Sequence, residues 1–205
     1  MKILFCNIAR MKYYKGIIPG VDTPQFGGDY VKRTGDAYEK NNFLPVEVNG
    51  EEFCFGFFET KNTTGKRSNQ LHIEKIEGVP EKSEVADGVL VIWCAVHNSG
   101  TAVMGWYKNA TVYRHYIEAE PPADDELHGP RTFIIKAKAA DCTLLPYGDR
   151  NMRMWWVPRK QQTRSFGFGR ANVWFAQEDS AVPYLEKLVA QIDAYHGENW
   201  LKKYP

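Results

Sequence analysis

The chain has 205 residues, of which 43% are hydrophobic and 14% aromatic. These values exclude a disordered chain and allow a substantial core, in one large domain or two small ones. The formal net charge of +1 favours no class of partner by itself. The sequence holds no signal-peptide pattern and no apolar run long enough to cross a membrane, so a soluble protein is expected.

Four cysteines lie far apart, and none forms a C-x-x-C pair or stands at zinc-ligand spacing from a histidine. They are Cys6, Cys54, Cys94 and Cys142. Cys6 and Cys94 lie inside apolar runs, which is typical of small buried hydrophobes. This usage predicts a reducing, cytoplasmic location, no metal site and no cofactor.

The chain begins with an apolar run and continues with a long segment rich in glycine and aromatic residues. Residues 2–8 (KILFCNI) predict a core strand. Residues 10–42 lack clear periodicity, which is often the mark of a functional loop. Within them, FGGDYV at 26–31 predicts either a tight glycine turn or a loop that brings the backbone close to a ligand. Residues 35–42 predict a short helix.

Two more strands are predicted before the centre of the chain. The sequence FCFGFFE at 53–59 predicts the first, and near-alternating apolar residues at 70–76 predict a second that is half exposed. Between them, KNTTGKRS at 61–68 is polar and basic. Both a solvated hairpin tip and a phosphate contact fit this turn.

The stretch from Gly88 to Tyr116 organises the chain, because it predicts three consecutive strands. Residues 88–96 are continuously apolar, as in a strand buried on both faces. A turn signal at 98–100 returns the chain antiparallel, and a polar break at 108–110 separates the third strand, 111–116.

The last third predicts an exposed acidic loop, a further strand and one clear helix. The acidic loop spans 118–129, and the strand spans 131–139. Residues 141–145 fit a short turn of helix or a strand end. The helix at 179–196 has Pro183 in its first turn, a cap at its start and an apolar face for packing.

These elements predict the fold class α+β, with a strongly bent, antiparallel, barrel-like sheet and a C-terminal packing helix. One recognition domain is expected over residues 1–196. Residues 197–205 are expected to form a tail or the start of a linker.

Charge is segregated along the chain although the net charge is close to zero. Residues 118–126 hold five acids and no base, whereas 149–170 hold six Arg or Lys and one acid. In 149–170 the cations interleave with aromatic residues, which suits phosphates and bases together. Solvated loops, or a glycine-rich hairpin with buried Phe and Trp, give the same pattern.

Motifs of common enzymes are absent: the sequence has no Walker loop, no G-x-S-x-G elbow, no H-E-x-x-H and no HNH metal cluster. The five histidines are scattered, and no pair of carboxylates is spaced for acid–base catalysis. We therefore expect a binding domain rather than an enzyme.

Four segments carry a resemblance to a known family: MGWYKNATVYR at 104–114, GGDYV at 27–31, LLP at 144–146 and FGFGRANVWF at 166–175. They resemble the N-terminal reader part of bacterial HNH restriction endonucleases that attack modified DNA. More narrowly, they are similar to the sulfur-binding domains of type IV restriction enzymes, which recognise phosphorothioate DNA. The resemblance implies double-stranded modified DNA as partner and an HNH nuclease domain, in cis or in trans, outside this chain.

A reader of phosphorothioate needs a shallow apolar cup for the poorly hydrated sulfur, with cations and hydrogen-bond donors around it for the remaining phosphate charge. Proline and aromatic rings suit the cup, and Arg, His and Asn suit its rim; Arg can also read a guanine edge. The residues assigned in this way to DNA and sulfur binding are Tyr30, Arg114, His115, Pro146, Tyr147, Arg164, Arg170, Ala171 and Asn172.

Two alternatives stay open. The first is a modified cytosine, methylated or hydroxymethylated, that is flipped into an aromatic pocket; it requires a deep cavity rather than a surface cup. The residues predicted for that pocket are Trp106, Tyr107, Lys108, Asn109 and Trp155, with Trp93 and Trp156 as further rings. The second alternative is a small-molecule enzyme or a peptide-binding module that uses the aromatic residues.

Overall fold

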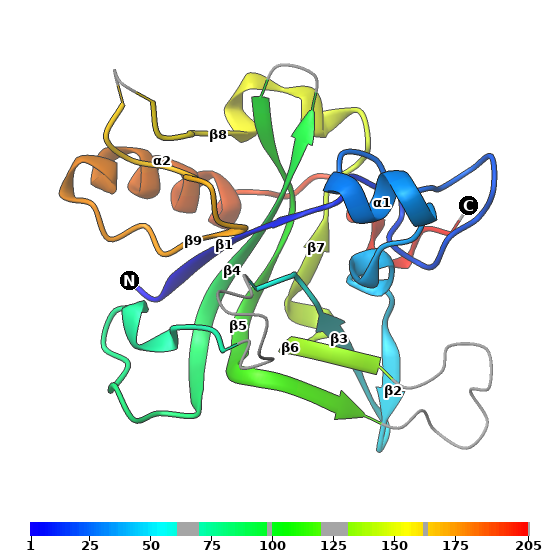
Figure 1. Ribbon diagram of the computed structural model, residues 1–205, viewed down its shortest axis with the longest axis horizontal. Coiled ribbons are helices and arrows are strands. Elements are labelled where there is room, and N and C mark those ends of the chain that lie inside the picture. Colours follow the sequence, from blue (N-terminus) through cyan, green and yellow to red (C-terminus); the bar gives the residue numbers. More distant parts are fainter. Residues whose placement is uncertain (61–69, 98–99, 120–130, 162–163, 205) are drawn as a thin grey trace.

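In the computed structural model, one large twisted sheet runs through the molecule (Figure 1). The structure describes residues 1–60, 70–97, 100–119, 131–161 and 164–204. The predicted turn at 61–68 and most of the predicted acidic loop therefore lie outside the described residues.

Nine strands within the described ranges form the sheet. They are β1 (Ile3–Ile8), β2 (Val46–Val48), β3 (Glu51–Gly56), β4 (Val85–His97), β5 (Gly100–Ala119), β6 (Arg131–Lys138), β7 (Cys142–Leu144), β8 (Trp156–Val157) and β9 (Val173–Trp174). Their order is β2-β3-β6-β5-β4-β1-β9, with β7 and β8 paired to β5 off this path. The predicted α+β class is confirmed. The sheet is open rather than barrel-like, and β1 pairs with β4 in parallel, so it is not purely antiparallel.

Helices flank the sheet. In the described part of the chain they are α1 (Gly28–Thr34) and α2 (Val182–Asp193), with the 3-10 helices η1 (Tyr38–Asn41), η2 (Ile73–Lys75), η3 (Ala139–Asp141), η4 (Asp149–Asn151), η5 (Arg153–Trp155), η6 (Asp179–Ala181) and η7 (Trp200–Lys202). None of these helices has the length and apolar character needed to cross a membrane.

β5 replaces two of the three predicted central strands. The polar break at 108–110 does not end the strand, because Asn109 adopts a left-handed φ of 51° and the pairing with β4 shifts its register there. A second register shift, between Val112 and Ile117, coincides with the sharp bend of β5 in Figure 1. The first half of β5 therefore pairs with β7 and β8, and the second half pairs with β6.

Both faces of the central strands are buried, as the continuous apolar sequence of β4 predicts. Leu4 of β1 and Trp93 of β4 join one hydrophobic cluster. Their neighbours Phe5 and Ile92 point the other way, because side chains alternate along a strand, and join a second cluster. Leu188 of α2 belongs to that second cluster, which confirms the predicted packing of the C-terminal helix on the sheet.

Most other predicted elements are confirmed with shifted bounds. The strands predicted at 2–8, 53–59 and 131–139 are β1, β3 and β6. The predicted helix is α2, which carries Pro183 in its first turn but is preceded by η6 and has no side-chain cap. All four cysteines are buried and unpaired, as expected of Cys6 and Cys94.

The strand predicted at 70–76 is wrong, since these residues contain the 3-10 helix η2. Leu71 and Ile76 are both buried, so the apolar residues that suggested a strand are instead the side chains by which a turn packs into the core. The backbone N–H of Leu71 donates to the carbonyl of Arg114 at 2.7 Å, which ties this turn to β5.

α1 forms where the sequence predicted a glycine turn or a ligand loop. Gly28 has a φ of +78°, a conformation that favours glycine. A Cβ on Gly27 would lie 2.2 Å from Cγ2 of Val31 and 2.9 Å from Cβ of Ala9. Both glycines thus allow α1 to pack beside the end of β1. The short helix predicted at 35–42 is the single turn η1.

The C-terminal residues, expected to form a tail, pack against the domain. Leu201 is buried, and the ring of Trp200 stacks on Tyr13 with centroids 5.4 Å apart. The side chain of Asn199 accepts a hydrogen bond from the backbone N–H of Leu144 at 3.0 Å. These contacts join the last described residues to β7 and to the segment that follows β1.

Candidate functional site

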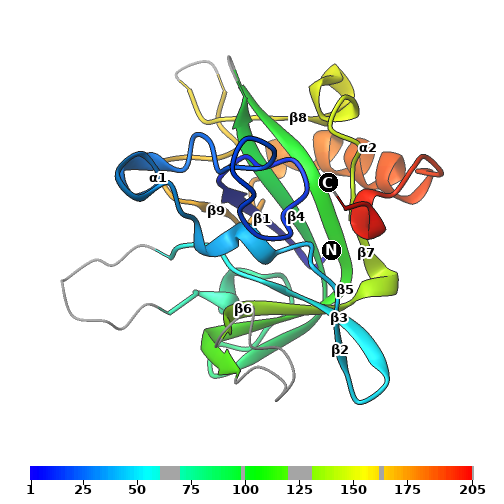
Figure 2. The same ribbon diagram turned by 90° about the vertical axis from the view of Figure 1, so that its right-hand side faces the viewer.

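A cleft of about 740 Å³ lies at the C-terminal end of β1, between that strand, α1 and the bend of β5. Figure 2 shows α1 beside the segment that follows β1, with the sheet behind it. The lining residues come from separate parts of the chain: the end of β1, α1, η1, the residues after β3, β5 and the residue before β9.

Four aromatic rings line this cleft in a row. The ring centroids of Tyr30 and Tyr38 lie 5.7 Å apart, those of Tyr38 and Phe57 5.2 Å apart, and those of Phe57 and Tyr116 5.1 Å apart. Tyr38 is 63% exposed, whereas Phe57 is 9% exposed. The row therefore runs from the exposed Tyr38 to the nearly buried Phe57 and gives the cleft an aromatic wall.

Three carboxylates, of Asp29, Glu39 and Glu59, also line the cleft. Glu39 accepts a hydrogen bond from the backbone N–H of Ala9 at 2.8 Å. Burial raises the pKa of Glu39 above its usual range, and nearby Glu59 adds to this effect. The side chain of Asn172 donates to the carbonyl of Glu59 at 3.2 Å. The cleft is therefore rich in acceptors for amino groups and unfavourable for a phosphate.

A smaller hollow of about 280 Å³ adjoins the cleft. Ala9 and Phe26 line the cleft, and their chain neighbours Arg10 and Gln25, paired by backbone hydrogen bonds of 2.7 and 2.9 Å, line the hollow. Tyr147 lies on the hollow too, with the guanidinium of Arg10 4.8 Å from its ring centroid.

The hollow is cationic, in contrast to the cleft. Arg10 is buried, contacts His97 Nδ1 through Nη1, and has an Nε without a hydrogen-bond partner among the described residues. Arg150 lies 5.7 Å from the centroid of the Tyr147 ring. The carboxylate of Asp22 is used by the backbone N–H groups of residues 12–14, at 2.6 to 3.1 Å. An anion of phosphate size fits this arrangement better than the cleft does.

The residues predicted for DNA and sulfur binding do not come together in one cup. Tyr30 and Asn172 line the cleft, Tyr147 lines the hollow, and Arg164 lines a third groove near β8. Three more of the predicted residues line none of these depressions: Pro146 and Ala171 are half-buried, and Arg170 is exposed.

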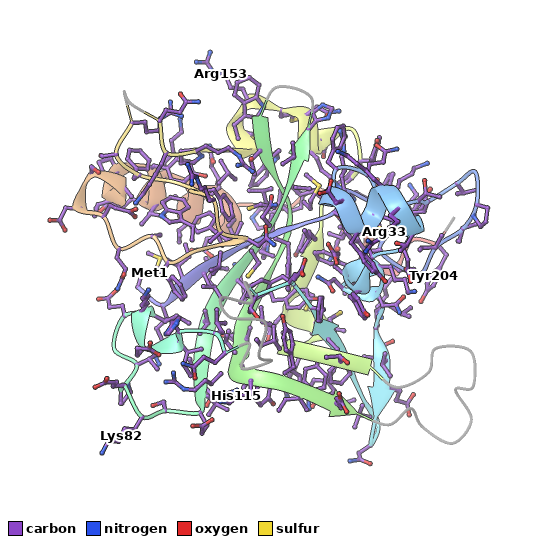
Figure 3. All side chains as sticks on the ribbon, viewed as in Figure 1. Met1, Arg33, Lys82, His115, Arg153 and Tyr204 are labelled. Atoms are coloured by element: carbon purple, nitrogen blue, oxygen red, sulfur yellow. The ribbon has the colours of Figure 1, made fainter. Side chains whose placement is uncertain are left out.

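Arg114 and His115 lie at the bend of β5 but do not line the cleft (His115 is labelled in Figure 3). Arg114 is 8% exposed and donates to the carboxylate of Glu74 at 2.7 Å and to two backbone carbonyls, one of them that of Ser83 at 2.8 Å. His115 is exposed, 3.8 Å from the carboxylate of Glu84. Because its guanidinium is occupied inside the protein, Arg114 is a fold-stabilising residue, and neither residue belongs to the site.

The Arg114–Glu74 pair makes stability depend on pH. Although desolvation opposes the shift, hydrogen bonds from its own backbone, His72 and Arg114 lower the pKa of Glu74 from 4.5 to about 2. A lowered pKa stabilises the fold above pH 4.5, and this contribution is lost as pH falls toward 2. We expect the urea midpoint of the wild type to fall more steeply over that range than that of Glu74→Gln. Parallel pH profiles of the two proteins would contradict this assignment.

Four of the five rings predicted for a base pocket are part of the core, which corrects the prediction for them, whereas Trp156 is 53% exposed. Trp106, Tyr107 and Trp155 are each at most 2% exposed, and the rings of Trp106 and Trp155 pack with centroids 5.6 Å apart. Lys108 is paired at 2.6 Å with a carboxylate of α2, and Asn109 occupies the bulge of β5. Trp106 and Trp155 pack in the cluster that contains α2, whereas Tyr107 packs against Trp93 and Phe43 in the cluster on the other face of the sheet.

Sequence reasoning missed most of the cleft, namely Tyr38, Glu39, Phe57, Glu59 and Tyr116. No local motif marks them, because they meet only when α1, β3 and the bent β5 are assembled. No group of side chains with metal-binding geometry occurs among the described residues.

No protein-family model matches the chain, and no curated protein or solved structure matches it either.

Proposed function

We propose that this chain binds double-stranded DNA that carries a modification, and that the cleft receives the modified base after it has left the helical stack. The observation that carries the proposal is the row of four aromatic rings beside three carboxylates at the end of β1. The resemblance of the central segment to readers of modified DNA agrees with it.

The chemistry of the cleft suits a nucleobase. Aromatic faces stack on any base, and each such stack contributes about 1–3 kcal/mol. Carboxylates accept hydrogen bonds from exocyclic amino groups, as on cytosine N4 or adenine N6. The same carboxylates repel phosphate, so the base enters and its sugar–phosphate stays outside. The volume of about 740 Å³ lies within the usual range for small-ligand pockets.

The cationic hollow offers a place for the phosphate that stays outside. Arg10 and Lys12 line it, and Ala9, the chain neighbour of Arg10, lines the cleft. A nucleotide whose base lies in the cleft therefore has cations beside its backbone. This arrangement supports one continuous site over both depressions.

A second candidate function, recognition of a backbone phosphorothioate, is favoured by the ring of Tyr147. That ring borders the hollow beside the guanidinium of Arg10, so the hollow combines an apolar ring with positive charge for a sulfur-bearing phosphate. In either case the chain acts as a reader without catalysis, and a separate HNH nuclease would cleave the DNA in a type IV restriction system.

Binding to four matched duplexes tests the proposal. Fluorescence polarisation at one fixed salt concentration would compare unmodified, phosphorothioate, 5-methylcytosine and 5-hydroxymethylcytosine DNA, because the phosphate contribution varies with salt. We expect tighter binding of a modified-cytosine duplex. Selective binding of the phosphorothioate duplex would favour the second candidate. Equal affinity for all four, or no binding, would refute both and leave a small-molecule or peptide ligand.

A further inference from the structure

A third depression, of about 410 Å³, lies beside β8 and has the opposite charge to the cleft. Its walls include three arginines, Arg153, Arg159 and Arg164, and no carboxylate among the described residues. We call this surface, formed by those arginines with Trp156, Phe166 and Tyr184, the arginine groove. Figure 3 shows Arg153 projecting from the top of the molecule.

Trp156 gives this groove an open aromatic face. It is 53% exposed, whereas Trp93, Trp106, Trp155 and Trp174 are at most 5% exposed. A single exposed ring is common on a protein surface, but this one lines a depression together with three arginines. Its open face can therefore stack on a flat partner that carries negative charge.

The arginines around this ring are available for an external anion. Within the described residues, none of the three forms a salt bridge, and Arg159 is held by a hydrogen bond from its Nε to Oγ1 of Thr101 at 2.8 Å. Arg153 and Arg164 are exposed. Backbone hydrogen bonds order the segment, since Lys160 donates to the carbonyl of Phe168 at 2.9 Å. The guanidinium of Arg159 is therefore held in place, and the side chains of Arg153 and Arg164 are open to solvent in the same depression as Trp156.

We propose that the arginine groove binds a single strand of nucleic acid, with an unpaired base on Trp156 and phosphates on the arginines. Stacking on an indole requires an unpaired base, so the occupant is a single strand and not a duplex. Phe166 lines the groove and Asn172 lines the cleft, so residues 166–172 join the two depressions along the chain. A strand opened by base flipping can follow this segment. The inference thus extends the proposed function, but its ligand needs no modification.

Binding of a short fluorescein-labelled oligothymidylate tests the groove. We expect the oligonucleotide to quench tryptophan fluorescence, because Trp156 is the exposed ring. Trp156→Leu should remove this quenching and lower the affinity about 5- to 150-fold. Arg164→Gln should lower the slope of log affinity against log salt by about 0.7, the value for one phosphate of a single strand. Lys82→Gln, an exposed charge at the lower corner of the molecule in Figure 3, serves as the matched control.

Wild-type affinity in Trp156→Leu would contradict binding of a single strand in the arginine groove. A salt slope in Arg164→Gln equal to that of Lys82→Gln would contradict it as well. Circular dichroism of each variant confirms folding, which the exposure of these side chains should preserve. The cleft variant Tyr38→Ala separates the two proposals, since it should bind oligothymidylate like the wild type. If the protein binds oligothymidylate through Trp156 but does not discriminate between modified and unmodified duplexes, the proposal for the arginine groove stands and the proposal for the cleft is refuted.

Discussion

Replacing Tyr38 with alanine is expected to weaken binding of a modified-base duplex about 5- to 150-fold, the equivalent of one lost base–aromatic stack. The ring is 63% exposed, so its loss should leave the fold intact. It lies second in the row of four rings, between Tyr30 and Phe57, where a base entering from the surface would pass it. Fluorescence polarisation on modified and unmodified duplexes measures the change.

Tyr204→Ala is the matched control for this substitution. Tyr204 is 58% exposed and does not line the cleft, so its removal takes away a similar ring without touching the site. Equal losses of affinity in the two variants would show that the effect comes from general surface change. An unchanged ratio of modified to unmodified binding in Tyr38→Ala would remove this ring from recognition.

Arg150→Met is expected to lower the free energy of unfolding by about 3 kcal/mol or more, because each buried carbonyl left without a donor costs about 1–3 kcal/mol. Arg150 is fully buried and donates to the carbonyls of Met11, Lys12 and Leu145 at 2.7 to 2.9 Å. Burial lowers its pKa to about 10, which still leaves it charged at neutral pH. Urea denaturation followed by circular dichroism measures the loss.

Two further variants define what Arg150 supplies. Arg150→Lys keeps the charge but lacks the planar fork, so it should recover only a small part of the stability. Arg153→Ala, on an exposed arginine three residues away, should stay within about 0.5 kcal/mol of the wild type. If Arg150→Met were as stable as Arg153→Ala, the carbonyls would have to find other donors, and the account of this buried cation would be wrong.

The sequence predicts a strand correctly where its residues are continuously apolar. It fails where hydrogen bonding to neighbouring strands continues through residues that look like a turn. β4 is buried on both faces, and its continuous apolar sequence records that directly. The 108–110 break in β5 looks like a turn, but Asn109 accommodates an extra residue as a bulge while pairing continues on both sides. Open or closed sheet geometry depends on all the pairings together, so no local pattern reveals it.

The candidate site was predicted only in fragments for the same reason. Tyr30 and Asn172 were singled out and do line the cleft, yet the rings that complete it come from η1, the residue after β3 and the bend of β5. The tryptophans of the central segment drew attention by composition, and they belong to the core: Trp106 lies in the cluster that contains α2, and Trp93 lies in the cluster on the other face of the sheet. Composition marks aromatic residues, but burial decides which of them a ligand can reach.

The cleft and the arginine groove carry opposite charges, although the net charge of the chain is close to zero. The cleft carries Asp29, Glu39 and Glu59, whereas the arginine groove carries three arginines and no described carboxylate. A ligand with amino groups at one end and phosphates along its length matches this division. A nucleic acid with one extruded base has that distribution.

The central claim is that a base leaves the duplex and enters the cleft, and 2-aminopurine fluorescence tests it most directly. The fluorophore would be placed beside a modified cytosine, where stacking quenches it and flipping of the neighbour releases it. We expect its fluorescence to rise when the wild-type protein binds, and to rise much less with Tyr38→Ala at saturating protein. Saturated binding of the same duplex with no rise in fluorescence would contradict base entry and would favour recognition of the backbone at Tyr147.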